Sequence, residues 1–242
     1  MKIIIAPQSF KGSLTAKEAT KIISDCVRNI FPESDLIGIP IADGGDGTLE
    51  TIIDATNGKI MNSQVKGPDN SVVQASWGLF NSEKNEKTGI IEMARASGLA
   101  MIDPKNLDPF NSTSFGTGEL ILDALKNGAK KIILGIGGSA TNDCGIGVAK
   151  AVGIKFLDSK NNEVGNNVSN FSNIKKINLD KFNSQLNDIK FEVACDVTNK
   201  LCGKEGASYI YGPQKGASAE DVKILDKNLL HIGNLIEKDL GV

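Results

Sequence analysis

Histidine is nearly absent from this sequence of 242 residues, which contains only His231. A Ser-His-Asp triad would have to use that single residue, and a metal site built from several histidines is excluded. Apolar residues recur at helical spacing around His231, so we expect it on the surface of a helix or partly buried against one. The chemistry must therefore rest on carboxylates, lysines, hydroxyl groups and backbone amides.

Excess positive charge and long apolar runs are missing as well. The formal net charge is −2, whereas a nucleic-acid-binding protein needs a basic face. No run of 18 apolar residues occurs, so we expect no membrane-spanning helix. The four cysteines form no C-x-x-C pair, which indicates reduced thiols in a cytoplasmic protein. The N-terminal run MKIIIAPQSF predicts a first strand rather than a signal peptide.

Glycine is abundant, with 26 residues, and its clusters fall where predicted strands meet predicted helices. Alternating strand and helix patterns predict an α/β fold with mostly parallel sheets and flanking helices. A β-rich segment near 64–94 has the composition of an antiparallel hairpin or meander. We expect two parts, a Rossmann-like α/β part at 1–62 and a second α/β domain at 63–242.

The most informative glycine cluster lies in the segment LGIGGSATNDCGIG, where a buried strand runs into Gly137, Gly138 and Ser139. We expect a helix to begin near Asp143, so that backbone amides and the helix dipole form a phosphate site. Ser139 and Thr141 add hydroxyl donors. A carboxylate at Asp143 would repel phosphate unless Mg²⁺ lay between them, so we take Asp143 as a candidate metal ligand. A tight strand-to-helix turn is the alternative.

The same segment also fits a dinucleotide-binding fingerprint. Gly135, Gly137 and Ala140 match G-x-G-x-x-[GA], and Asp158 ends the next predicted strand, where a ribose-binding acid would lie. A dinucleotide-dependent oxidoreductase is therefore the competing hypothesis, although Asp143 fits it poorly.

Further candidates follow other predicted strands. Asp43 and Asp46 flank paired glycines after the second strand, where a base, a metal ligand or an Asp-rich turn would fit. Lys11 follows the first strand and could hold a phosphate or carboxylate. Gly116 and Thr117 open a predicted helix, which is either a second phosphate site or an ordinary capped end.

Asp196 ends a late apolar strand, again on the side where ligands bind in open α/β sheets. Lys204 and Lys215 are possible phosphate partners nearby. Arg95 is one of only two arginines and suits carboxylate recognition, with Glu92 as a possible partner.

Taken together, these segments resemble the bacterial type I glycerate kinase family. The residues that carry the resemblance occur in the family's order along the whole chain: APQSFKGSL at 6–14, PIADGGDGT at 40–48, IEMARASGL at 91–99, TSFGTGELI at 113–121, GIGGSATNDCGIG at 135–147, and ACDVTNKLCGKEGAS with GPQKGA at 194–217. Three small departures are visible at Gln8, Asp46 and Cys144, where the family more often has Asp, Glu and Gly. Gln8 removes a possible carboxylate.

The resemblance implies an enzyme that transfers the ATP γ-phosphate to D-glycerate with Mg²⁺, giving 2-phosphoglycerate by preference, in a cleft between two α/β domains. Family members are well over 300 residues long, so the chain looks truncated at its C-terminus, and an inactive fragment is a further alternative. The sequence predicts no oligomeric state. The roles expected are catalysis by Asp43, Asp196 and Lys11, phosphate binding by Gly137, Gly138, Ser139, Thr141, Asp143, Gly116 and Thr117, and metal binding by Asp143 and Asp196.

Overall fold

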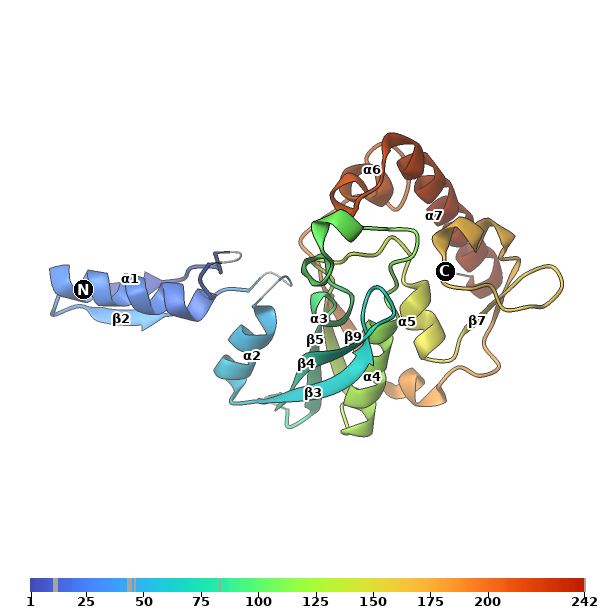
Figure 1. Cartoon of the computed structure of the whole chain (residues 1–242). Helices are drawn as coiled ribbons and strands as arrows, with labels where there is room; N and C mark the ends of the chain where they lie inside the picture. Colours follow the sequence, from blue (N-terminus) through green and yellow to red (C-terminus); the bar gives the residue numbers. More distant parts are fainter. Residues whose placement is uncertain (11–12, 43–44, 46, 83, 242) are drawn as a thin grey trace.

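The computed structural model describes residues 1–10, 13–42, 45, 47–82 and 84–241. The chain forms a central five-stranded sheet, two separate two-stranded sheets and helices that flank them (Figure 1). The strands are β1 Lys2–Ile5, β2 Asp35–Gly38, β3 Lys59–Lys66, β4 Val72–Asn81, β5 Lys87–Glu92, β6 Lys131–Gly135, β7 Lys155–Leu157, β8 Lys176–Asn178 and β9 Lys190–Ala194.

Seven α-helices and five short 3₁₀ helices connect these strands within the described residues. The α-helices are α1 Ala16–Ile30, α2 Thr48–Thr56, α3 Ala94–Ser97, α4 Phe115–Lys126, α5 Ile146–Ala151, α6 Ala207–Tyr211 and α7 Ala219–Leu240. The 3₁₀ helices are η1 Leu99–Met101, η2 Pro104–Asn106, η3 Val168–Asn173, η4 Ser184–Asp188 and η5 Pro213–Lys215. None of the helices in the described ranges is long and apolar enough to cross a membrane.

The central sheet has the order β3-β4-β5-β6-β9. Its β3, β4 and β5 strands are antiparallel, as the β-rich segment predicts, and β5-β6 and β6-β9 are parallel. The expected α/β class is therefore confirmed, and the parallel side of the sheet carries the candidate site. One expected strand lies elsewhere, because β7 pairs with β8 in a small antiparallel sheet instead of extending the central one.

Two hydrophobic clusters cover opposite faces of the central sheet. Trp77 and Ile91 pack with Leu120 of α4 on one face, and Ile90 packs with Leu49 and Ile53 of α2 on the other. Adjacent residues of β5 thus point into different clusters, as the alternation of side chains along a strand requires. A third cluster joins α5, β7, β8, η3 and α7.

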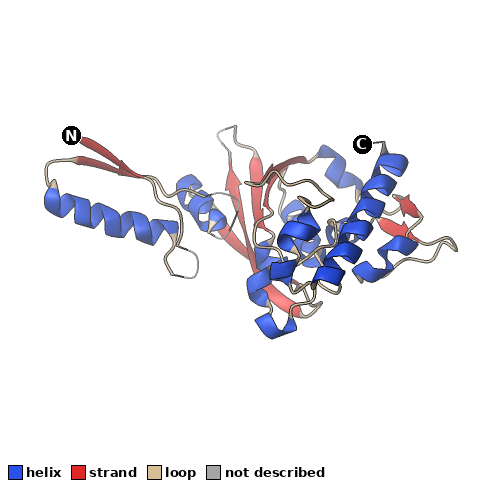
Figure 2. Cartoon of the chain, turned by 90° about the horizontal axis from the view of Figure 1, so that it is seen from above, coloured by secondary structure: helices blue, strands red, loops and turns tan. Residues whose placement is uncertain are grey.

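The elements β1, α1 and β2 form a separate unit in which β1 and β2 pair in parallel beside α1. This unit extends away from the central sheet in both views (Figures 1 and 2). A capping box starts α1, since the Thr15 side chain accepts from the Glu18 amide and Glu18 accepts from the Thr15 amide. The expected boundary at residue 62 falls within β3, and the division into domains stays a prediction.

Candidate functional site

The candidate site lies where the parallel strands β6 and β9 end side by side. Gly135 pairs with Ala194, so the loop after β6 and the segment after β9 leave the sheet at the same edge. This is the edge at which ligands bind in open α/β sheets. A cavity of about 390 Å³ opens there, lined by Gly137, Gly138, Ser139, Asp196 and Lys215 among others. Residues chosen from the sequence for phosphate binding and catalysis are thus brought together.

Backbone hydrogen bonds from a neighbouring corner fix the glycine-rich loop. The Leu99 amide donates to the Gly138 carbonyl at 2.8 Å, and the Ala140 amide donates to the Ser97 carbonyl at 2.9 Å. Gly138 has a φ of +71°, a conformation that favours glycine. The corner itself needs Gly98, because a Cβ there would lie 2.0 Å from the Ala94 carbonyl oxygen. These contacts within the protein therefore fix the conformation of the glycine-rich loop.

Lys215 reaches this loop from η5. Its ammonium donates to the Ser139 hydroxyl at 2.9 Å and to the Thr141 carbonyl at 2.6 Å, and the residue is only 8% exposed. Burial lowers the pKa of Lys215 to about 8, and the nearby charge of Asp143 opposes that shift only in part. A cation that loses its proton near neutral pH thus forms part of the cavity wall.

Asp143 has a different surrounding from the one expected. It is 3% exposed, and its carboxylate accepts hydrogen bonds from the Ser114 amide and hydroxyl and from the amides of Gly145 and Gly147. The helix α5 begins at Ile146 rather than near Asp143. The carboxylate therefore caps α5 and joins it to the start of α4. A metal ion at Asp143 would have to displace these donors, so its surroundings do not favour the expected role as a metal ligand.

The start of α4 is packed rather than open. A Cβ on Gly116 would lie 1.8 Å from the Lys66 carbonyl oxygen, and the fully buried Thr117 hydroxyl lies 2.9 Å from that of Ser97. Ser114, just before the helix, donates to Asp143. These contacts account for Gly116 and Thr117 by packing and do not support the phosphate contact expected from them.

Arg95 forms the link between α2 and the central sheet. Its guanidinium donates to Glu92 at 2.6 Å, to both oxygens of Glu50 and to the Ser76 hydroxyl. Burial disfavours its charge, but the bond to Glu92 and the charges of Glu92 and Glu50 outweigh burial and raise the pKa of Arg95. Glu92 is 2% exposed and also accepts from the Leu49 amide, near the start of α2.

The expected Glu92–Arg95 partnership is thus confirmed, whereas Glu50 was missed because it lies 45 residues from Arg95. With its donors directed at protein groups, Arg95 is suited to positioning α2. Asp43, Asp46 and Lys11, which we expected in catalysis or binding, lie outside the described residues.

Asp196 is exposed and lines the cavity beside the glycine-rich loop. Among the residues that the structure describes, no three His, Cys, Asp or Glu side chains are grouped to hold a metal ion. Mg²⁺ is usually bound by one or two carboxylates together with substrate phosphates. Asp196 fits that arrangement as a single carboxylate.

A second, more apolar cavity of about 500 Å³ adjoins the first. Its lining includes Leu134, Val148 and Leu229, and it shares Ile136, Ser139, Ala207, Tyr211 and Lys215 with the first cavity. The thiol of Cys144 borders it, and burial raises the pKa of that thiol to about 11. A thiol with such a pKa is a poor nucleophile.

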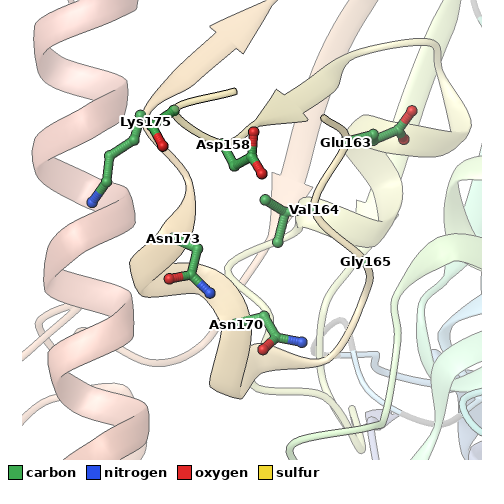
Figure 3. Close-up of a pocket in the computed structure, with 8 residues that line it drawn as sticks. Asp158, Glu163, Val164, Gly165, Asn170, Asn173 and Lys175 are labelled. Carbon is green, nitrogen blue, oxygen red and sulfur yellow. The ribbon is translucent and has the colours of Figure 1, made fainter. Parts of the chain in front are cut away.

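The fold does not support the dinucleotide-binding alternative. Its strand-helix-strand unit would require β7 to join β6 in a parallel sheet, and β7 pairs only with β8 among the described strands. Asp158 accepts from the amides of Lys160 and Asn162 in its own turn, which lowers its pKa. It borders a cavity with Glu163 and Lys175 (Figure 3), separate in its lining from the site at the sheet edge.

Known proteins resemble the chain over its whole length. The model of the glycerate kinase family matches residues 3–242. The glycerate 2-kinase of Escherichia coli is 47% identical over 242 residues, and the glycerate kinase of Haemophilus influenzae is 46% identical over 241 residues. Each alignment covers all of this chain and 63% of the relative.

A solved structure also resembles the chain over its whole length. The crystal structure of a protein from Salmonella typhimurium LT2, assigned as glycerate kinase 2, matches with a TM-score of 0.89 and 45% identity, covering 100% of this chain and 64% of that one. The chain thus spans a little under two thirds of the length of the relatives that it matches.

Proposed function

The chain belongs to the glycerate kinase family, and from this premise we propose that it carries the phosphate-binding side of an ATP-dependent kinase for D-glycerate. The observation that carries the proposal is the cavity at the ends of β6 and β9, where the Gly137–Ser139 loop, Asp196 and Lys215 meet. The product that we favour is 2-phosphoglycerate, and the compartment is the cytoplasm.

Phosphoryl transfer demands positioning and charge neutralisation more than covalent chemistry. Gly137 and Gly138 leave room for a phosphate to approach the main chain, and the Ser139 hydroxyl lies in the same cavity wall. Asp196 is the described carboxylate of this cavity and would accept the proton of the glycerate hydroxyl. We further propose that Asp43 shares or takes that role and that Lys11 binds the substrate.

A magnesium ion, when bound with the nucleotide, would neutralise phosphate charge, and Asp196 is the described residue that would contact it. We assign no ligand role to Asp143, because its carboxylate already accepts four hydrogen bonds. The division into an N-terminal part at 1–62 and a second domain at 63–242, with the substrate between them, remains part of the proposal.

The direct test is ADP release from ATP and Mg²⁺, with and without D-glycerate, and NMR identification of the phosphorylated carbon. Glycerate-dependent release supports the proposal, and release at the same rate without glycerate contradicts it. If no ADP forms while the chain still binds ATP, the chain is a non-catalytic fragment of the kinase. Tight NADH binding without ATP binding would instead favour the oxidoreductase.

Asp196→Asn gives a residue-level prediction. The substitution removes a proton acceptor while keeping the side chain's size, so we expect kcat to fall about 10²-fold to 10⁴-fold. Asp188→Asn, at the exposed end of η4, is the matched control and should leave kcat unchanged. Near-normal turnover of the Asp196 variant would remove this residue from the mechanism.

A further inference from the structure

Lys215 is a buried cation whose hydrogen-bond partners are neutral. Both acceptors of its ammonium, the Ser139 hydroxyl and the Thr141 carbonyl, carry no charge. Among the described residues, no carboxylate lies within ion-pair distance of it. Buried charges in proteins are normally paired or ligand-bound, because moving an unpaired charge out of water costs a large free energy. The cavity wall therefore contains a positive charge that an anionic ligand would complete.

The backbone fixes the position of this lysine. The Lys215 amide donates to the Gly212 carbonyl at 3.0 Å, and the Gly216 amide donates to the Pro213 carbonyl at 3.1 Å. Gly216 has a φ of +95°, and a Cβ there would lie 2.7 Å from both Leu107 Cβ and the Leu107 carbonyl oxygen. The turn after Lys215 therefore requires glycine, and the lysine is presented to the cavity from a rigid base.

The position of Lys215 also selects the kind of anion. It borders both the cavity that contains the glycine-rich loop and Asp196 and the more apolar cavity beside it. A nucleotide matches these two cavities, because its charged phosphates suit the cavity with the glycine-rich loop and its apolar base suits the more apolar one. Because the ammonium bonds directly to two residues of the glycine-rich segment, the nearest ligand oxygen would be a phosphate held in that loop.

We propose that Lys215 binds a phosphate oxygen of the nucleotide and, through Ser139 and Thr141, holds the glycine-rich loop around that phosphate. This inference rests on the proposed kinase function and adds a nucleotide-binding residue to it. It is distinct from Lys11, which the resemblance connects with the substrate.

Equilibrium binding of a non-hydrolysable ATP analogue tests the inference. Lys215→Met keeps the length of the side chain and removes its charge, so we expect affinity for the analogue to fall about 10-fold to 100-fold. Lys215→Arg keeps the charge and should retain most of the affinity. Lys223→Met, which removes an exposed lysine paired with Glu220 on α7, is the control and should bind as the native chain does.

The pH dependence provides a second readout. A lysine with a pKa of about 8 loses its charge between pH 7 and pH 9.5, so native affinity for the analogue should fall across that range. Lys215→Arg should stay flat, because a guanidinium remains charged. The other ionisable groups that line the two cavities are Asp143, Cys144, Cys195, Asp196 and Tyr211, and both proteins contain them. The difference between the two profiles therefore isolates residue 215.

The results of these binding experiments distinguish a failure of the Lys215 inference from a failure of the proposed kinase function on which it rests. If the native chain does not bind the analogue, the proposed function fails. If it binds and Lys215→Met binds equally well, or if only glycerate binding weakens, the inference alone is overturned, because the anion would then be a carboxylate or absent. Should Lys215→Met not fold, matching pH profiles for the native chain and Lys215→Arg would overturn the inference equally.

Discussion

The N-terminal unit and the central sheet differ in how completely their strands are covered. In the central sheet, Trp77, Ile91 and Leu120 are fully buried between the strands and α4. In the N-terminal unit, Ile4 of β1 is 61% exposed, and Ile30 near the end of α1 is 70% exposed. Parallel strands usually have helices on both faces, yet β1 and β2 have only α1 beside them among the described elements. The helix α1 therefore relies mainly on local signals such as its capping box, whereas the central sheet is built by long-range packing.

The better-packed of the two regions contains the candidate site, and α2 connects the regions. The glycine-rich loop and Asp196 extend from the well-packed sheet, so their geometry does not depend on the N-terminal unit. The Asp43–Asp46 segment leads into α2, which Arg95 and Glu92 fasten to the sheet. Local substitutions should therefore have unequal effects in the two regions.

The largest difference is expected from truncating large apolar side chains. Trp77→Ala should reduce the free energy of unfolding by about 4 kcal/mol, because it removes a fully buried ring from the core. Ile4→Ala should cost less than about 0.5 kcal/mol, because most of that side chain is already in water. Urea denaturation of both variants measures the contrast. Equal losses would mean that the N-terminal unit is covered as well as the sheet.

A smaller loss is expected at the link between the regions. Arg95→Met leaves the buried Glu92 carboxylate without its cation, so we expect a loss of about 3 kcal/mol. Arg28→Met, which changes the other arginine on the exposed side of α1, is the control and should change stability little. Urea midpoints that match for the two variants would show that Arg95 does not fasten α2.

The smallest effect concerns the helix caps. Thr15→Ala and Ser218→Ala each remove a capping box, at α1 and α7 respectively, and each should cost about 1 kcal/mol. Because α7 also packs Leu225 and Ile232 into a core cluster, amide exchange should increase more in the first turn of α1 than in that of α7. Equal increases would contradict the claim that α1 relies mainly on local signals.

Local features were predictable from the sequence, and long-range partners were not. The first strand at the N-terminus, the β-rich segment near 64–94 and the glycine-rich loop after β6 all depend on neighbouring residues. The roles of Asp143 and Arg95 depend on Ser114 and Glu50, which lie 29 and 45 residues away. A pattern of adjacent residues cannot reveal such partners, and the expected role of Asp143 as a metal ligand stays a prediction.

The same limit explains two further differences. The strand β7 has ordinary strand composition, and only its pairing with β8 excludes it from the central sheet. Gly116 fits the pattern of a phosphate-binding glycine, and only the approach of the Lys66 carbonyl shows that close packing also requires a glycine there. Conversely, Asp196 and the Gly137–Ser139 loop line one cavity because both follow parallel strands, whose ends meet at one edge, and their roles in binding and catalysis stay predictions.

Amide chemical-shift mapping with a non-hydrolysable ATP analogue tests the central claim most directly, namely that the end of the packed sheet holds the nucleotide phosphates. We predict the largest shifts for the amides of residues 137–141 and 195–197, with small shifts for β1 and β2. Unchanged amides in those two segments, with shifts instead around Asp158 and Lys175 in the separate cavity of Figure 3, would contradict the account.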